Sequence, residues 1–190
     1  ISALAVHGRS RNQRFNGRAS FELMANVKAQ RRLPIIANGD ITHATQAKAL
    51  IDRYGFDGIM IGRAAQGNPW IFARCQALIN TKNLPLPTIN TAAQQIYTHI
   101  QALHQHYGKQ AVCIARKHLH AYLRQHPDYA DLRSQINHAA DANSQLTLIE
   151  KHFTIHTHTN AFQDTSWDAN LLSIRQPKDS HAPHYHSRRY

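Results

Sequence analysis

The sequence predicts an α/β fold, namely the C-terminal three βα units of a (β/α)8 barrel followed by a small all-helical domain. Two short apolar runs end in glycine turns that carry polar groups, first at Asn38-Gly39-Asp40 and then at Gly62-Arg63. Short buried strands that stop at such turns and lead into helices are typical of parallel βα units. From Thr91 onward the apolar residues recur at helical spacing alone, which predicts the second domain.

The first unit begins with an apolar strand over residues 1–6. Ser20 is suited to cap a helix, because its hydroxyl can accept a hydrogen bond from a free N–H group of the first turn. Phe21, Met24 and Val27 follow at helical spacing. We therefore expect one strand, a loop and one helix in this part of the chain.

Two further units follow. Pro34 opens a second strand at 35–37, and the next helix ends at Gly55 with the apolar face Ala47, Leu50, Ile51 and Tyr54. A third strand is expected at 59–61, and Asn68-Pro69 is a favourable helix start. A closed barrel of this kind needs eight strands, so we expect five to be missing. The chain does not begin with Met and opens directly on a strand, so we expect a fragment, with residues 1–80 as the incomplete barrel.

The second domain is expected at 91–155, after a linker at 81–90 that is rich in Asn, Thr, Pro and Leu. Four amphipathic stripes predict a small helical bundle. After about residue 155 the periodicity ends, and we expect a disordered tail over 156–190. The four stripes are Ile96, Ile100, Leu103 and Tyr107; Ala115, Leu119 and Tyr122; Tyr129, Leu132 and Ile136; and Leu146, Ile149 and Phe153.

The positive charge of the chain is concentrated near its start. The sequence holds 22 Lys and Arg against 11 Asp and Glu, a formal net charge of +11. Residues 1–33 carry seven positive and one negative side chain, hence +6. This concentration favours a polyanionic partner such as nucleic acid, and a charge that serves only solubility is the alternative. The loop after the first strand contributes Arg9, Arg11, Arg14 and Arg18.

The composition argues against other classes of protein. Two cysteines far apart, Cys75 and Cys113, exclude a disulfide framework and fit a reducing compartment. No apolar run reaches the ~20 residues that span a bilayer, so we expect a cytoplasmic protein without membrane contact. The fifteen histidines suggest a metal site, but those of the expected tail lack oriented support, and we expect none.

The two glycine turns predict a phosphate site. In (β/α)8 barrels the loops after the last two strands commonly bind phosphate, with functional groups at the carboxyl ends of the strands. Glycine allows close approach of the backbone, and the guanidinium of Arg63 offers a fork of donors to an anion. His7 ends the first strand and is expected at the same rim. On the residues alone, the expected phosphate group is that of a cofactor.

A basic helix face is a second candidate. Arg116, His120 and Arg124 fall four residues apart and share one face, with Lys117 beside it. Two interpretations remain open here, a solvated basic face and a surface that binds the phosphodiester backbone of a nucleic acid.

Several strings, in order and with matching spacing, resemble the bacterial tRNA-dihydrouridine synthases, most closely their B subfamily. The resemblance covers about residues 1–155. The strings are His7-Gly8-Arg9-Ser10-Arg11; Phe15-Asn16-Gly17; residues 36–41, Ile-Ala-Asn-Gly-Asp-Ile; residues 60–72, Met-Ile-Gly-Arg-Ala-Ala-Gln-Gly-Asn-Pro-Trp-Ile-Phe; and residues 114–118, Ile-Ala-Arg-Lys-His.

This resemblance implies an FMN-containing barrel with a helical tRNA-binding domain, in an enzyme that uses NADPH to reduce uridine to 5,6-dihydrouridine in the tRNA D-loop. By position, the FMN-binding residues would be His7, Asn38, Gly39, Asp40, Gly62 and Arg63. The residues expected to contact tRNA are Arg9, Arg11, Arg116, Lys117 and His118.

The resemblance also implies what this chain lacks. The general acid of the family is a cysteine from the earlier half of the barrel, so no catalytic residue is assigned here and the isolated fragment is expected to be inactive. His120 and Ala121 stand where Gly and Trp are usual. The complete enzyme is expected to be a monomer. Two alternatives remain, another phosphate-binding barrel oxidoreductase acting on a small metabolite, and a noncatalytic RNA-binding remnant.

Overall fold

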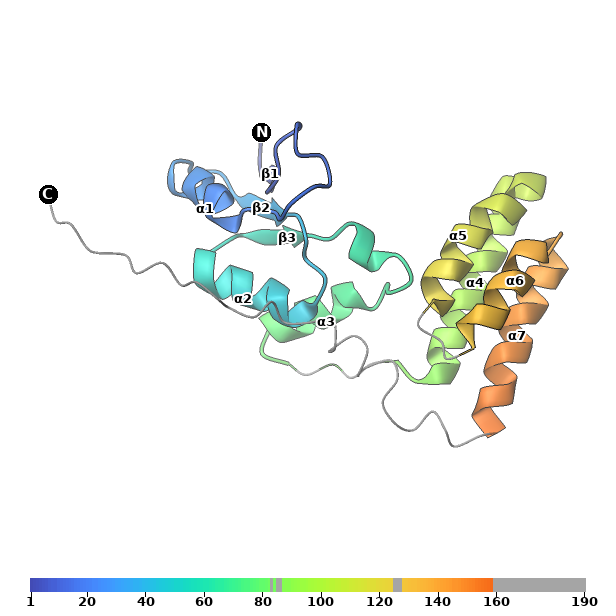
Figure 1. Cartoon of the computed structure of the whole chain (residues 1–190). Helices are drawn as coiled ribbons and strands as arrows, with labels where there is room; N and C mark the ends of the chain where they lie inside the picture. The colour runs from blue at the N-terminus through green and yellow to red at the C-terminus, as the bar shows by residue number, and fades with distance from the viewer. Residues whose placement is uncertain (83, 85–86, 125–127, 159–190) are drawn as a thin grey trace, which may run out of the picture.

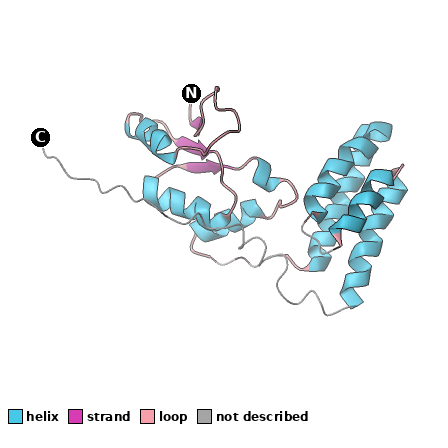
Figure 2. Ribbon diagram, in the orientation of Figure 1, coloured by secondary structure: helices cyan, strands magenta, loops and turns pink. Residues whose placement is uncertain are grey.

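A computed structural model describes residues 1–82, 84, 87–124 and 128–158 of the chain. Within these residues, a small sheet with three α-helices precedes a group of four α-helices (Figures 1 and 2). The described part is therefore mixed α/β and rich in helix. None of its helices has both the length and the apolar character needed to cross a membrane.

The sheet is parallel and has the order β1-β2-β3. Its strands are β1 (Leu4–His7), β2 (Ile35–Asn38) and β3 (Gly58–Met60). The register aligns His7 with Asn38 and Asn38 with Met60, so the carboxyl ends of the strands meet at one edge. This edge carries two of the side chains that the sequence assigned to the site.

Helices α1 (Phe21–Ala29), α2 (Ala44–Tyr54) and α3 (Ile71–Ile79) follow the three strands in turn. The predicted cap of α1 is confirmed, because the Ser20 hydroxyl accepts a hydrogen bond from the N–H of Leu23 at 3.3 Å. The predicted end of α2 at Gly55 is confirmed as well. The alternation of strand and helix is therefore encoded locally.

β2 extends one residue beyond the predicted strand, to Asn38, and β3 covers 58–60 instead of the predicted 59–61. Two larger differences from the predicted boundaries have a physical reason. β1 starts at Leu4, whose N–H group donates to the carbonyl of Pro34, and the paired part of the neighbouring strand begins only after this proline. Proline offers no N–H group to extend the ladder. α3 starts at Ile71 rather than at Pro69, because the chain first forms the short 3-10 helix η1 (Arg63–Ala65) and a turn.

The helices cover one face of the sheet. Ile35 and Ala37 of β2 are fully buried and belong to one apolar core with Met24 of α1, Leu50 of α2 and Cys75 of α3. Ile36 and Asn38, which alternate with them, are only half buried. Because parallel sheets are normally covered on both faces, the described residues leave one face of this sheet without its usual cover.

The second part consists of α4 (Ile89–Tyr107), α5 (Ala111–Leu123), α6 (Tyr129–His138) and α7 (Ala142–His158), with the 3-10 helix η2 (Gly108–Gln110) between α4 and α5. The four predicted helices are confirmed. Their predicted stripes supply most of a second apolar core, formed by Ile96, Ile100, Ala115, Leu119, Tyr122, Leu123, Leu132, Ile136 and Ile149. The expected tail over 156–190 lies outside the described residues from 159 onward, and α7 continues through His158.

One polar side chain ties the helices together inside the core. Gln145 of α7 is fully buried. Its Oε1 accepts a hydrogen bond from Nε2 of His104 on α4 at 2.8 Å, and its Nε2 donates to the carbonyl of Val112 on α5 at 3.0 Å. A buried amide with both ends bonded fixes the relative register of three helices.

Replacing Gln145 by alanine is expected to lower the free energy of unfolding by about 3 kcal/mol, because it leaves two polar groups unbonded and opens a cavity. Urea denaturation followed by far-UV circular dichroism measures this. Gln135→Ala is the matched control, since Gln135 is exposed on α6. Equal stability of the two variants would contradict the assigned role.

Candidate functional site

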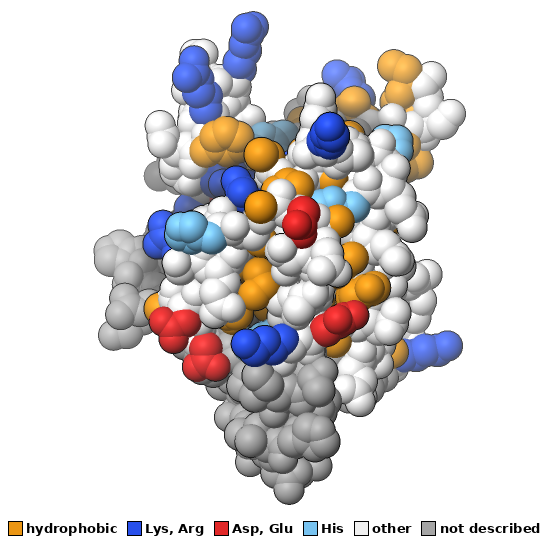
Figure 3. Space-filling view, turned by 90° about the vertical axis from the view of Figure 1, so that its right-hand side faces the viewer, with side chains coloured by type: hydrophobic (Ala, Val, Ile, Leu, Met, Phe, Trp, Pro, Cys, Tyr) orange, Lys and Arg blue, Asp and Glu red, His pale blue; other side chains and the backbone are white. Residues whose placement is uncertain are grey.

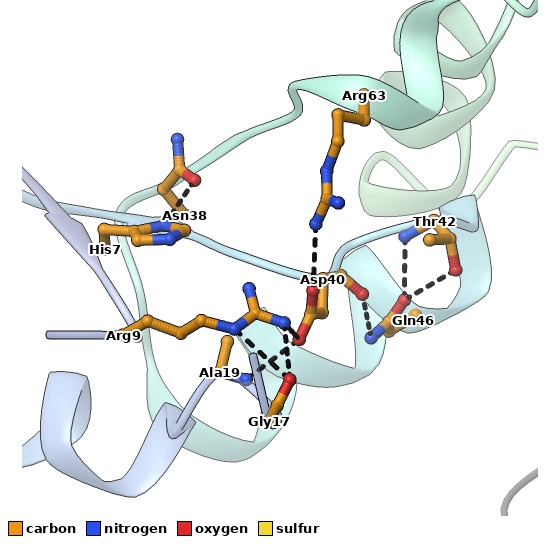
Figure 4. Close-up of polar contacts among 9 residues, drawn as sticks. All are labelled: His7, Arg9, Gly17, Ala19, Asn38, Asp40, Thr42, Gln46 and Arg63. Carbon is orange, nitrogen blue, oxygen red and sulfur yellow. Dashed lines mark hydrogen bonds and ion pairs between the residues drawn. The ribbon is translucent and has the colours of Figure 1, made fainter. Parts of the chain in front are cut away.

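The candidate site lies at the carboxyl ends of the three strands (Figure 4). His7 ends β1 and Asn38 ends β2, and Nδ1 of His7 donates a hydrogen bond to Oδ1 of Asn38 at 2.9 Å. Both side chains come from the last position of their strand. The sheet thus brings together two residues that are 31 positions apart in the sequence.

The Asn38-Gly39-Asp40 turn is held in place from several sides. Gly39 has φ +128°, and a Cβ atom there would lie 2.7 Å from Cβ of Ala19 and 3.3 Å from Cε1 of His7. Only glycine fits this position. The Asp40 carboxylate accepts a hydrogen bond from the N–H of Ala19 at 2.9 Å, and the Asp40 carbonyl accepts one from Nε2 of Gln46 at 3.0 Å.

Arg9 braces this turn from inside. Its side chain is only 4% exposed, and Nη2 donates both to the Asp40 carboxylate and, at 2.8 Å, to the carbonyl of Gly17. Nη1 of Arg9 is buried and has no hydrogen-bond partner among the described residues. The sequence assigned Arg9 to RNA, whereas this geometry ties its guanidinium to the turn and leaves little of it accessible.

Arg63 approaches the same carboxylate from η1. Its Nη2 lies 3.7 Å from Oδ1 of Asp40, its side chain is 64% exposed, and its guanidinium lies over the ring of Phe15, 5.0 Å from the centroid. A Cβ atom built on Gly62 meets no described atom within 4 Å. Beside the Asp40 turn there is therefore open space next to a glycine, with an accessible guanidinium at its border.

The charge at this edge is positive. Burial raises the pKa of Asp40, but the hydrogen bonds from Arg9 and from the Ala19 N–H, together with the charges of Arg9 and Arg63, outweigh burial and hold the pKa below its usual value. Asp40 is therefore ionised at neutral pH. Two arginines against one carboxylate leave a net charge of +1, which suits an anion.

The lowered pKa of Asp40 has a defined effect on stability. A carboxylate whose folded-state pKa is depressed stabilises the fold fully above its unfolded pKa of about 4, and the contribution is lost as the pH falls through the folded value. Asp40→Asn is therefore expected to be less stable than the parent chain at pH 7, with the difference shrinking below about pH 4. Urea unfolding at several pH values measures this.

A suitable control is Asp52→Asn, which removes only an exposed pair with Lys48 on α2. Such i,i+4 pairs contribute about 0.5 kcal/mol or less. An Asp40→Asn difference that persisted undiminished into acid would contradict the role given to the carboxylate.

The residues assigned to RNA are not gathered on one surface. Arg11 is exposed in the loop before α1. On α5, Arg116 donates to the carbonyl of Ala139 at 3.2 Å, Lys117 is exposed, and His118 lies against His99. Consecutive helical residues point about 100° apart, so a run of three cannot share one face. Figure 3 likewise shows Lys and Arg side chains dispersed over this end of the molecule.

The predicted basic face of α5 is also used within the fold. Nε2 of His120 donates to Oδ1 of Asn137 on α6 at 3.0 Å, and Arg116 bonds the carbonyl at the end of the same helix. Arg124 remains exposed. The sequence left open a solvated basic face or a surface that binds the phosphodiester backbone. Neither interpretation fits the whole face, because Arg116 and His120 form hydrogen bonds with α6.

A cavity that the sequence did not indicate lies between the two parts of the chain. It measures about 430 Å³ and is lined by Ala65, Gln66, Gly67, Pro69, Gln95, His99, His118 and Tyr122. Its walls come from the segment after η1 and from α4 and α5. Sequence spacing alone could not pair His99 with His118, since the two residues lie on different helices.

Comparison with known protein families places these features in context. A family model described as "Dihydrouridine synthase (Dus)" matches residues 1–161. The chain belongs to the dihydrouridine synthase family. The family resemblance seen in the sequence motifs is thereby confirmed.

Relatives of this dihydrouridine synthase chain are bacterial proteins named tRNA-dihydrouridine synthase B. The Xanthomonas axonopodis pv. citri protein is 43% identical over 155 residues, which is 80% of this chain and 47% of that protein. The Salmonella typhimurium protein is 43% identical and the Escherichia coli K12 protein 42% identical, each over 156 residues, 80% of this chain and 48% of the relative. The chain spans about half the length of the curated relatives it matches.

Proposed function

We propose that this chain is the C-terminal part of a flavin-dependent tRNA-dihydrouridine synthase, which reduces uridine to 5,6-dihydrouridine in the D-loop of tRNA with NADPH as the reductant. The observation that carries the proposal is the meeting of two glycine turns and an accessible Arg63 at the carboxyl edge of a parallel sheet. Membership in the family and the printed names of the relatives support the reaction class.

In this proposal residues 1–80 are the last three βα units of a (β/α)8 barrel, and 91–155 form a helical domain that binds tRNA. The sheet supports the first part, because its strands are parallel and one face lacks cover in the described chain. In a closed barrel that face points into the barrel interior. The remaining strands would then come from outside the described residues.

The residues at the strand ends fit the phosphate of FMN. The space beside Gly62 admits a group close to the backbone, and Arg63 offers charged donors at its border. Arg9 adds a second positive charge behind the Asp40 turn. Asn38, Gly39, Asp40, Gly62 and Arg63 would hold the phosphate end, and His7 would lie against the ring system.

When bound, the flavin supplies the hydride chemistry for reduction of the uracil C5=C6 bond, and the protein supplies binding and orientation. This chain would hold and orient the cofactor through the two turns. Arg9 would act as a positioning residue, since it fixes the turn without reaching solvent.

Neither cysteine of the chain is assigned to proton donation. Cys75 lies in the apolar core, where burial raises the pKa of its thiol. Cys113 is exposed on α5. The proton donor would come from a residue outside this chain, so the chain alone would not complete the reaction.

Transfer RNA is the proposed partner, and the complete enzyme is proposed to be monomeric. The accessible cations Arg11 and Lys117 are the candidates for contact with the phosphodiester backbone. His118 instead borders the cavity.

The test uses the whole open reading frame that contains this chain. We expect the purified protein to carry bound flavin and to convert uridine to dihydrouridine in an unmodified tRNA transcript when NADPH is supplied, measured as the gain of two hydrogen atoms by mass spectrometry of the nucleosides. Tight flavin binding without tRNA affinity would favour an oxidoreductase of small metabolites. Salt-dependent tRNA binding without flavin would favour a noncatalytic RNA-binding protein.

A further inference from the structure

The cavity between the segment after η1 and helices α4 and α5 has a wall of aromatic rings. The rings of His99 and His118 meet edge to face with their centroids 4.9 Å apart. Nδ1 of His99 and the hydroxyl of Tyr122 share a hydrogen bond of 2.9 Å, and Trp70 packs on Tyr122 with centroids 6.4 Å apart. Each ring of the wall is thus held by a neighbour, which gives the cavity a defined shape.

The lining bears no formal charge at neutral pH. Burial lowers the pKa of His99, and burial together with electrostatic repulsion from the neighbouring His99 and Lys117 lowers the pKa of His118. A neutral imidazole presents one N–H donor and one acceptor nitrogen. Gln66 and Gln95 are exposed at the cavity and add two amides, each of which both donates and accepts.

The segment after η1 forms another wall of the cavity, and its backbone lies unusually close to α5. Gly67 has φ +75°, and a Cβ atom there would lie 2.1 Å from the carbonyl oxygen of Ala121 on α5. The backbone of this segment therefore lies directly on α5. Gln66 follows Arg63 by only three residues, so the segment that borders the cavity continues from the proposed cofactor turn.

We propose that this cavity binds one unpaired nucleobase of the RNA, distinct from the uridine that is reduced. The inference rests on the proposed function and extends it. An uncharged lining with flat rings and paired donors and acceptors suits a planar heterocycle, and it offers no Lys or Arg side chain to a phosphate. The volume lies within the range of small-molecule sites.

The position of the cavity separates it from the reacting base. In Figure 1 the ends of β1 and β2 lie on one side of η1, and the segment that approaches α5 lies on the other. His7 and Asn38 belong to the first side, and His99 and His118 to the second. A base held in the cavity would fix the RNA beside the reaction site.

The first test uses the 190-residue chain and the four ribonucleosides as probes, added one at a time. Nuclear magnetic resonance of the imidazole groups is expected to show saturable shifts of His99 and His118 with at least one nucleoside. His106, exposed at the far end of α4, is the internal control and is expected not to shift. Absence of saturable shifts with every nucleoside, or equal shifts with inorganic phosphate, would overturn the proposal.

The second test measures binding of an unmodified tRNA transcript at several salt concentrations. His118→Ala and Gln95→Ala are expected to weaken binding about tenfold and fivefold at every salt concentration, because a base contact releases no counterions. Lys117→Ala, the matched control on α5, is expected to reduce the salt slope by about one. Gln95 is exposed, so its variant keeps the fold.

The outcomes separate this inference from the proposed function. Parent-like tRNA affinity in both cavity variants would overturn the nucleobase site and leave the proposed function standing. A smaller salt dependence of tRNA binding in His118→Ala would assign His118 to a phosphate contact, and this result would also overturn the nucleobase site. Absence of tRNA binding by the parent protein would instead count against the proposed function, and with it the RNA base proposed here.

Discussion

Replacing Arg9 by alanine is expected to lower the free energy of unfolding of the sheet by about 3 kcal/mol, because breaking a buried pair leaves the other charge without its partner. The Asp40 carboxylate would keep the N–H of Ala19 and the distant guanidinium of Arg63. The carbonyl of Gly17 would lose both of its contacts with Arg9. Hydrogen exchange of the backbone amides of β2 measures the change where it arises.

Two further variants make this result specific. Arg9→Lys keeps the charge but lacks the fork that binds Asp40 and Gly17 together, so an intermediate loss is expected. Arg11→Ala removes a nearby exposed arginine and should leave exchange in β2 unchanged, within about 0.5 kcal/mol. If the β2 amides exchanged at the same rate in Arg9→Ala as in Arg11→Ala, Arg9 would not stabilise the turn.

The second large effect is expected for Gly67→Ala. The added methyl group would lie 2.1 Å from the carbonyl oxygen of Ala121. The segment must then move away from α5, in addition to the cost of a positive φ for alanine, and together these are expected to destabilise the contact by about 3 kcal/mol. Loss of the ring contact between Trp70 and Tyr122 is the accompanying sign, visible in the aromatic resonances of Tyr122.

The chain offers a matched control for this substitution. Gly62 lies on the same segment, and its added Cβ atom meets no described atom within 4 Å. Gly62→Ala is therefore expected to leave the contact with α5 intact. Equal behaviour of the two alanine variants would show that the segment does not depend on close approach at Gly67.

Local signals explain why much of the fold was predictable. The Ser20 hydroxyl caps α1 by accepting a hydrogen bond from the N–H of Leu23, only three residues later. The N–H of Gly55 ends α2 by donating to the carbonyl of Ile51 in the last turn. The same holds for the two turns of the site, since Asn38-Gly39-Asp40 bends the chain with its own residues. The sheet then brings these turns together through the pairing of β2 with β3.

Features that depend on tertiary packing were not predictable. Arg9 looked like one of several loop arginines, and only its pairing with Asp40, 31 residues away, distinguishes it from exposed Arg11. Arg116 and His120 shared a predicted basic face, yet α6 takes up their hydrogen bonds. The sequence pattern of one helix does not indicate where a helix from another part of the chain packs against it.

The central claim is that the two strand-end turns bind the phosphate of a flavin. The most direct measurement compares the dissociation constants of FMN and riboflavin for the whole protein that contains this chain, in the parent and in Arg63→Ala. We expect the parent to prefer FMN by about 100-fold and Arg63→Ala to lose most of that preference, with riboflavin affinity unchanged, as expected for a charge-assisted hydrogen bond to phosphate. An equal preference for FMN in both proteins would contradict the claim.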